Sequence, residues 1–313
     1  MLRHTLRSLA GILWVIFLLS IFTFVLSRAV PGGPWDVGDI KFPLTDHQIA
    51  LAKAKYGLDK PILEQYLIWL RNAVTFDFGS PYSAPEMSVT GLIMKQLPYS
   101  AVVGGLAAAL ALILGITLGM IAASKQNSWI DISINSFAIT IGTIPGFVLG
   151  FVLAYYFGVK LGWFPTGGWQ NAPKYLVLPV VAYGFPAIGW VARWTRQCMV
   201  EAMSADYVRT ARSKGVRQAG VMTRHVMRNA AIPMVTAFLP MIPNMMTGSL
   251  FIEKTFGIPG LGQYFVNSAN TRDYPLIIGI TIFWAALITL TYLITDILYV
   301  IIDPRVRLEE KKK

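Results

Sequence analysis

The chain of 313 residues is strongly apolar, because 55% of its residues are hydrophobic and only 14% carry a charge. Soluble domains carry about 25% charged residues, and the mean hydropathy here is +0.54. This composition excludes disordered, collagen-like, coiled-coil and disulfide-scaffold classes, and it disfavours an ordinary soluble protein of two domains. It predicts a membrane protein, in which the position of the net charge of +11 indicates the topology.

Six runs without a charged residue predict an all-α integral membrane protein with six transmembrane helices. A hydrocarbon core of about 30 Å needs about 20 apolar helical residues to cross it. The runs cover residues 9–27, 96–124, 132–159, 175–192, 229–252 and 274–295, of which the fourth is slightly short. The first could instead be a cleaved signal peptide, but its length and the lack of an A-x-A site favour a retained helix. A seventh run, 255–271, is rich in Gly, Asn, Ser and Gln and is assigned to water.

The Lys and Arg residues indicate the orientation of the chain. Of the 27, 16 fall in segments 1–8, 123–129, 193–229 and 303–313, which places both termini in the cytoplasm by the positive-inside rule. The chain thus divides into an N-terminal tail with the first helix (1–30), an extracytoplasmic segment (31–95), a membrane core (96–302) with the cytoplasmic loop 193–229, and a cytoplasmic C-terminal tail (303–313).

The extracytoplasmic segment is expected to form two short helices. Thr45 and Gln48 have the spacing of a capping box, before a helix that would stop at Gly57. Pro61 suits the first turn of a second helix. The apolar positions of that helix are Ile62, Leu63, Tyr66, Leu67, Leu70, Ala73 and Val74.

Small residues recur at every fourth position of the second transmembrane helix. They are Ala107, Ala111, Gly115, Gly119 and Ala123. Such ridges let helices approach closely in lipid, and packing within one bundle is favoured here over homodimerisation.

Proline and glycine interrupt the third, fourth and fifth transmembrane helices. The interruptions are Pro145 with Gly146, then Pro179, Gly184, Pro186 and Gly189, then Pro233, Pro240 and Pro243. Broken helices are tolerated beside other helices or a water-filled cavity. Both a transport pathway and a static kinked bundle are therefore open interpretations, and Asn244 is the polar candidate for a pathway.

Ionisable and nucleophilic side chains give no sign of a catalytic centre. Asp131 is expected at the membrane interface, and a structural pairing of Asp296 near the inner interface is favoured over a transport role. The three His residues fall outside the helices, Cys198 is alone, and no G-x-x-x-x-G-K-[ST] string occurs. Any ATP would therefore be hydrolysed by another chain.

Loop 193–229 has the pattern of a basic amphipathic helix. Its apolar stripe comprises Val200, Met203, Tyr207, Val208 and Ala211, and its polar side carries Arg209, Arg212 and Lys214. Gly215 is well placed to stop the helix. Such a helix could lie on anionic lipid or dock on a cytoplasmic partner.

The same loop resembles the EAA-type coupling loop of binding-protein-dependent ABC importer permeases. The strings DYVRTARSKG at 206–215 and RHVMRNAAIP at 224–233 are similar to the oligopeptide/dipeptide/nickel branch. Two departures from the wider family, RTA at 209–211 in place of Glu-Ala-Ala and a more distant Pro233, are usual in that branch.

Other motifs extend the resemblance over nearly the whole chain. They are VPGGP at 30–34, YGLDKP at 56–61, DFG at 77–79, FPTGGW at 164–169, IEKTF at 252–256, PGLG at 259–262, RDYP at 272–275 and DPRVR at 303–307. Each is weak alone, but together and in order they are specific. Within the family, the chain is most similar to B-type permease subunits of oligopeptide importers.

The resemblance implies a multi-pass permease of a bacterial or archaeal plasma membrane that carries peptides. Its implied partners are a homologous C-type permease, two ATP-binding subunits, an extracytoplasmic solute-binding protein and the bilayer, without nucleic acid. ATP and Mg²⁺ are expected on the partner subunits, and no cofactor or metal on this chain. The implied coupling contacts are Glu201, Asp206, Tyr207, Arg209, Thr210, Ala211, Lys214 and Gly215. Arg224, His225 and Arg228 could brace that helix or lie in solvent or lipid.

The candidates for the pathway or its gate combine both lines of reasoning. They are Pro145, Pro240, Asn244, Glu253, Pro259 and Gly260. The alternatives to a peptide importer are the same class with another solute (a nickel chelate, glutathione or an oligosaccharide), a secondary transporter, and a membrane enzyme. The scarcity of buried charge disfavours the secondary transporter, and the missing intramembrane His and metal ligands disfavour the enzyme.

Overall fold

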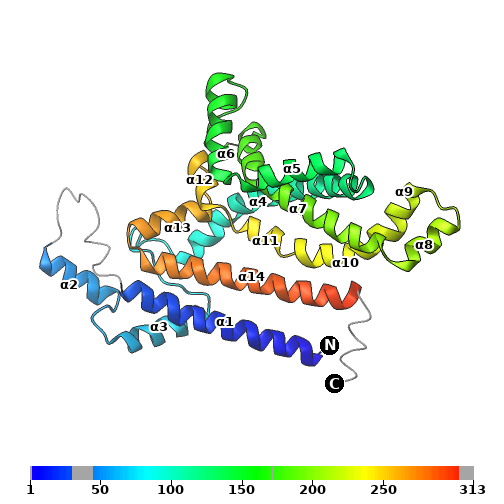
Figure 1. Ribbon diagram of the computed structural model, residues 1–313. Coiled ribbons are helices and arrows are strands. Elements are labelled where there is room, and N and C mark those ends of the chain that lie inside the picture. Colours follow the sequence, from blue (N-terminus) through cyan, green and yellow to red (C-terminus); the bar gives the residue numbers. More distant parts are fainter. Residues whose placement is uncertain (1, 30–44, 171, 303–313) are drawn as a thin grey trace. The chain divides into compact units, whose positions relative to one another are not determined.

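The computed structural model describes residues 2–29, 45–170 and 172–302, and every regular element in these ranges is a helix. Figure 1 shows the helices in the order of the chain. The chain divides into two compact units. Residues 1–98 and 259–290 belong to the first unit, and residues 99–258 and 291–313 belong to the second. The helices α4 (Val89–Ser124) and α14 (Tyr274–Ile302) contribute residues to both.

Within the described ranges, five helical segments are long and apolar enough to cross a membrane. They are Leu9–Ala29 in α1 (Leu2–Ala29), α4, α7 (Lys174–Met203), Gln218–Met246, and Tyr274–Thr295 in α14. A sixth span results if α5 (Trp129–Thr143) and the segment Gly146–Lys160 are taken together, although they meet at an angle of 91°. The prediction of a helical membrane protein is confirmed. The side chain of Asp296 and the tail 303–313 lie outside the described residues.

The first unit contains the two short helices expected after α1. The capping box precedes α2 (Asp46–Lys55): the Thr45 N–H donates to Gln48 Oε1 at 2.9 Å, and the Gln48 N–H donates to Thr45 Oγ1 at 3.4 Å. Gly57 follows α2 with φ +64°, and Pro61 directly precedes α3 (Ile62–Val74). These local predictions are confirmed.

The expected apolar face of α3 is wrong in part. Leu63 and Val74 are 70% and 75% exposed, whereas Tyr66 and Trp69 pack on Phe24 of α1. Tyr66 also forms a hydrogen bond with Ser20 at 2.9 Å. The aromatic side chains therefore set the orientation of α3 through a ring cluster that periodicity alone does not reveal.

A buried carboxylate holds the loop that follows α3. Asp273, before α14, accepts hydrogen bonds from the Tyr82 N–H at 3.0 Å, the Ser83 N–H at 2.9 Å and the Ser83 hydroxyl at 2.6 Å. Asp273 is fully buried, and burial raises the pKa of the neighbouring Tyr82 phenol. The loop and the start of α14 are thus joined by charge-assisted hydrogen bonds.

Small residues bring α4 directly against α7 in the second unit. A Cβ atom on Gly115 would lie 2.6 Å from the Val191 side chain, and one on Gly119 would lie 2.5 Å from the Ala192 carbonyl oxygen. Ala111 is fully buried on the same side. The predicted ridge of small residues therefore packs within the chain.

The breaks in the helices agree with the prediction only in part. The third span bends at Pro145, before α6 (Gly146–Leu153) and the π-helix η2 (Ala154–Lys160), as expected. The fifth is interrupted at Pro240, between α10 (Met227–Phe238) and α11 (Met241–Met246), but the breaks predicted at Pro233 and Pro243 are wrong, because these residues lie inside α10 and α11. The predicted break of the fourth is wrong, because α7 continues through Pro179 and Pro186. Helix α7 packs against α5, α6 and α10, and neighbouring helices allow proline inside a transmembrane helix.

The segment 193–229 is more helical than a connecting loop. Its first part, to Met203, is the end of α7. The short helix α8 (Asp206–Ser213) follows, and α9 (Gln218–Gly220) and the π-helix η3 (Val221–Val226) then lead into α10. The expected single amphipathic helix from Val200 to Ala211 is wrong, because it is interrupted at residues 204–205. Charged residues bounded the apolar runs, but the helices continue beyond them.

Candidate functional site

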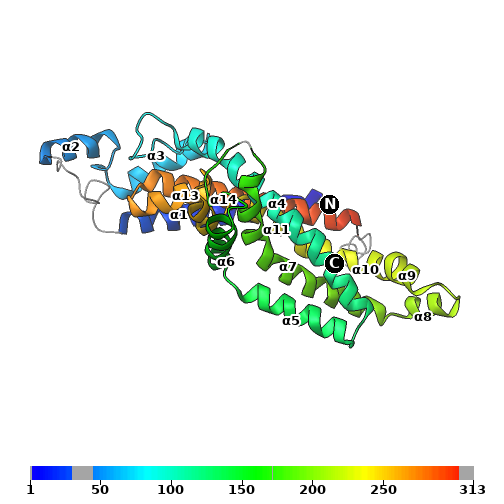
Figure 2. The same cartoon turned by 90° about the horizontal axis from the view of Figure 1, so that it is seen from above.

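The helix α8 lies at the end of α7 that is remote from α6 (Figures 1 and 2). The extended backbone of Ala205 (φ −75°, ψ 148°) separates the two helices. At the other end, the Gly215 N–H donates to the Arg212 carbonyl at 2.9 Å, and Gly215 has φ +75°. Glycine adopts this left-handed conformation without the Cβ penalty. The predicted helix stop is therefore present.

One face of α8 is anchored in the core of the second unit. Val208 is fully buried and Ala211 is 5% exposed, and both belong to a cluster with Met199 of α7 and with Val221 and Val226 of η3. Ala211 thus packs on the core of the unit, and its expected contact with a partner stays a prediction. Apolar side chains of η3 therefore pack against this inner face of α8 and support it.

The opposite face of α8 is open and basic. All the expected contact residues except Ala211 are exposed. They are Glu201 at the end of α7, and Asp206, Tyr207, Arg209, Thr210, Lys214 and Gly215. Arg209 lies 3.9 Å from Asp206, and both side chains are largely in solvent, so this pair adds little stability. Arg224 and Arg228 are exposed and His225 is partly buried. A rigid helix thus presents charged side chains on a fixed base.

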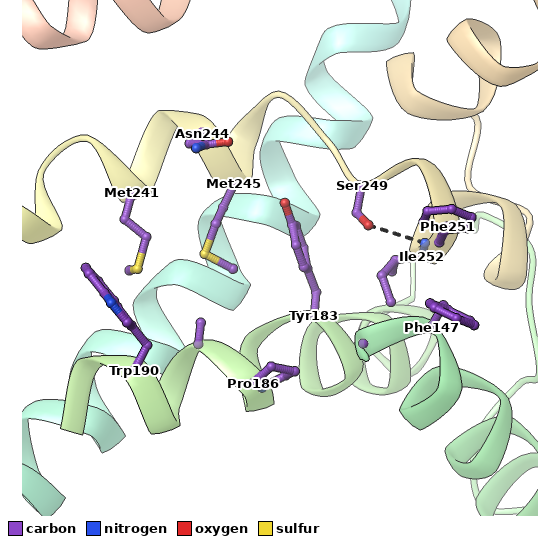
Figure 3. Close-up of a pocket in the computed structure, with 12 residues that line it drawn as sticks. Phe147, Tyr183, Pro186, Trp190, Met241, Asn244, Met245, Ser249, Phe251 and Ile252 are labelled. Carbon is purple, nitrogen blue, oxygen red and sulfur yellow. Dashed lines mark hydrogen bonds between the residues drawn. The ribbon is translucent and has the colours of Figure 1, made fainter. Parts of the chain in front are cut away.

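A second feature of the same unit is a cavity of about 420 Å³. Figure 3 shows Tyr183, Pro186 and Trp190 of α7 on one side and Met241, Asn244 and Met245 of α11 on the other. Phe147 of α6 and the start of α12 (Leu250–Phe256) complete the wall. The volume lies within the range of about 300–1,000 Å³ that is typical of small-molecule sites.

The walls of this cavity are aromatic and methionine-rich. Its polar groups come from Tyr183, Asn244 and Ser249, and the Ser249 hydroxyl also accepts a hydrogen bond from the Ile252 N–H at 3.4 Å. The Tyr183 hydroxyl points across the cavity toward α11 (Figure 3). The lining residues are all uncharged. The cavity can therefore accept apolar groups and a few hydrogen-bonding groups, without covalent chemistry.

Breaks in the helices create the cavity. Pro145 precedes α6, Pro240 precedes α11, and Ser249 caps α12. Gly248, with φ +101°, makes the turn between α11 and α12. Each break ends a helix beside the cavity, so the backbone turns around it rather than filling it.

Glu253 is buried next to the cavity wall. It is 1% exposed, and the Ser100 hydroxyl donates to its Oε1 atom at 2.7 Å. It follows Ile252, which lines the cavity. Pro259 and Gly260 belong to the first unit, where Gly260 precedes α13 (Leu261–Asn270). Of the six pathway candidates, Asn244 lines the cavity, Pro145, Pro240 and Glu253 lie on the elements that form it, and the other two lie in the other unit.

The sequence did not single out the aromatic and methionine side chains of the cavity, because they are typical of any transmembrane helix. Their proximity to Pro145 and Pro240 was the signal that could have found Phe147 and Met241. The sequence did not predict the partner of Asp131 either. Asp131 lies in the first turn of α5, is 2% exposed and is paired with Arg196 of α7; its expected place at the membrane interface stays a prediction.

Comparisons with known proteins agree over the length of the chain. Residues 115–308 match the family described as binding-protein-dependent transport system inner membrane component, and residues 1–102 match the N-terminal family of the same systems. The dipeptide transport system permease protein DppB of Bacillus subtilis is 35% identical over 99% of this chain and 100% of its own length. The oligopeptide transport system permease protein OppB is 37% identical in Haemophilus influenzae and 38% identical in Escherichia coli. Each OppB match covers 98% of this chain and 100% of the relative.

A solved structure supports the fold. An inward-facing structure of the MetNI methionine ABC transporter matches with a TM-score of 0.54 and 15% sequence identity, over 68% of this chain and 96% of that chain. At this identity the likeness concerns the fold alone.

Proposed function

We propose, from the premise that this chain belongs to the family of inner membrane components of binding-protein-dependent transport systems, that it is the B-type permease subunit of an ATP-driven peptide importer. It is a multi-pass protein of the plasma membrane of a bacterium or archaeon. The full-length similarity to dipeptide and oligopeptide permeases supports peptides as the cargo. The chain is non-catalytic and binds neither ATP nor Mg²⁺, which belong to its partners.

The observation that carries the coupling role is the two-sided character of α8. Its inner face is fixed by Val208 and Ala211, and its outer face offers Asp206, Arg209 and Lys214 to a partner. A helix that is packed on the core passes a displacement on to the helices it contacts, whereas a mobile loop would change its own conformation instead. In this proposal, closure of two ATP-binding subunits moves α8, and α7 and α10 move with it.

The cavity between α6, α7, α11 and α12 is the proposed wall of the peptide pathway. Its apolar side chains suit the variable side chains of peptides, and Tyr183 and Asn244 can form hydrogen bonds with a peptide backbone. Its uncharged lining supports a passage driven by ATP rather than by an ion gradient. A C-type permease would supply the other half of the pathway, and a solute-binding protein would deliver the peptide; nucleic acid has no part in it.

Purification and transport together test the proposal. An affinity tag on this chain should bring down a second permease and two ATP-hydrolysing subunits. The reconstituted complex with its binding protein should take up labelled di- to pentapeptides only when ATP is present on the side of α8. Peptide uptake by the chain alone without ATP would overturn the proposal, and uptake of a non-peptide solute alone would overturn its substrate.

A further inference from the structure

An ion pair joins α5 to α7, between the buried side chain of Asp131 and the partly buried side chain of Arg196, which is 26% exposed. Arg196 Nε donates to Asp131 Oδ1 at 2.5 Å, and Arg196 Nη2 donates to Asp131 Oδ2 at 2.6 Å. Asp131 also accepts hydrogen bonds from the Asn135 side-chain amide at 2.7 Å and from the Asn127 N–H at 2.9 Å. Both carboxylate oxygens are thus engaged in a bidentate, charge-assisted geometry that fixes orientation as well as distance.

The ion pair lies at the end of α5 that faces away from the bend. Asp131 is in the first turn of α5, and the other end of α5 leads through Pro145 to Gly146 and Phe147 in the cavity wall. Arg196 is on α7, ten residues before α8 begins. The pair therefore joins the helix that carries α8 to the helix that leads to the cavity.

Neighbouring contacts make the α7 side of this connection stiff. Gly119 of α4 is so close to Thr195 that an added Cβ atom would lie 2.6 Å from the Thr195 Cβ atom. Met199, one turn after Thr195, packs in the same cluster as Val208 of α8. A displacement of α8 is thus passed to α7 at the level of Arg196 through close-packed atoms.

Apolar contacts alone would let α5 slide along α7. The two helices pack side by side along their length (Figure 2), with Gly189 of α7 touching Ala138 of α5. Small apolar surfaces define a separation but resist sliding weakly, whereas one buried polar pair can fix the register between helices.

We propose that Asp131 and Arg196 form a joint that transmits the movement of α8 to α5 and hence to the cavity wall. The joint rests on the proposed function, because it positions the pathway rather than touching the peptide. Without it, ATP hydrolysis moves α8 and α7 while α5 lags behind, so that fewer peptides cross for each ATP hydrolysed.

The test compares three variants in the full complex with its partner subunits. Asp131→Asn combined with Arg196→Met removes both charges, so no unpaired ion is left in the protein. Arg196→Lys keeps the charge but loses the planar fork of donors. Arg193→Lys is the matched control, since its side chain is exposed and bonds only loosely to Gly189 of its own helix, at 3.4 Å. The measured quantities are the melting temperature, the ATPase rate, and the peptide taken up per ATP.

We expect the neutral pair to keep its melting temperature and its ATPase activity while peptide uptake per ATP falls by about fivefold or more. Arg196→Lys should show a smaller fall in the same ratio, and Arg193→Lys should show none. An unchanged ratio in the neutral pair would overturn the joint, as would a loss of stability and ATPase activity with uptake per ATP preserved. If the neutral pair does not assemble, an unchanged ratio in Arg196→Lys has the same meaning. A wild-type complex that lacks ATP-driven peptide uptake would instead contradict the proposed function.

Discussion

The left-handed backbone of Gly215 defines where α8 ends. A residue other than glycine costs about 1–2 kcal/mol in this conformation, and no atom lies within 4 Å of an added Cβ atom. The penalty is therefore conformational rather than steric. Gly215→Val should lower peptide uptake per ATP, whereas Gly215→Asn should retain most of it, because Asn tolerates positive φ and a β-branched residue does not. Reconstituted uptake assays measure the difference, and equal losses in both variants would contradict it.

The buried carboxylate of Asp273 makes a second prediction for a single residue. Asp273→Ala removes the carboxylate that accepts hydrogen bonds from the N–H groups of Tyr82 and Ser83, and a hydrogen bond to a charged group contributes about 1.5–3 kcal/mol. We expect a lower melting temperature of the purified protein and faster proteolysis of the loop 79–84. Asp59→Ala, at an exposed carboxylate, is the control. A melting temperature unchanged from that of the control would refute the assigned role.

At the scale of an element, α8 depends on its inner face. Ala211→Glu places a charge in the cluster with Val208 and Val221, where an unpaired carboxylate is strongly disfavoured. The helix should detach from its base, and the ATP-binding subunits should be lost during purification while the chain remains in the membrane. Thr223→Glu, at an exposed position of η3, should retain them. Retention by both variants would show that docking does not require the base of α8.

Charge-free runs predicted where the helices lie, but they did not predict where they end. Charges stop a run, although helices such as α7 continue past them, through the exposed Arg193 and through Arg196, which pairs with Asp131. Prolines predicted breaks correctly at Pro145 and Pro240 and wrongly at Pro186, where α7 continues. Helix capping at Thr45 was predictable because it depends on residues close in sequence.

At the scale of the whole molecule, the distribution of basic residues predicts the topology. Cys198 is the one cysteine of the sequence and it is buried, so single introduced cysteines can be labelled without background. A membrane-impermeant maleimide should label Asp59→Cys in intact cells and Lys214→Cys only in inside-out vesicles. The unmodified chain, with Cys198 alone, should stay unlabelled in both. The reverse pattern would invert the orientation inferred from the Lys and Arg counts.

The candidate site was less predictable than the topology. Gly215 and the basic side of α8 follow from local sequence, and Asn244 was found because it is polar in an apolar run. The partnership of Asp131 with Arg196 spans 65 positions in the sequence, and the cavity joins residues from Gly146 to Ile252. Contacts between residues so distant in sequence depend on the packing of the helices, which cannot be read from a single sequence.

The uncharged lining of the cavity has a kinetic consequence. If peptides pass along this wall, as proposed, it offers no charge to hold a peptide terminus, and we expect a short residence time that favours turnover. Peptides of different net charge should then leave the wall at similar rates. The affinity of the solute-binding protein for a peptide, rather than the rate at which the peptide passes the cavity, would decide which peptide is imported.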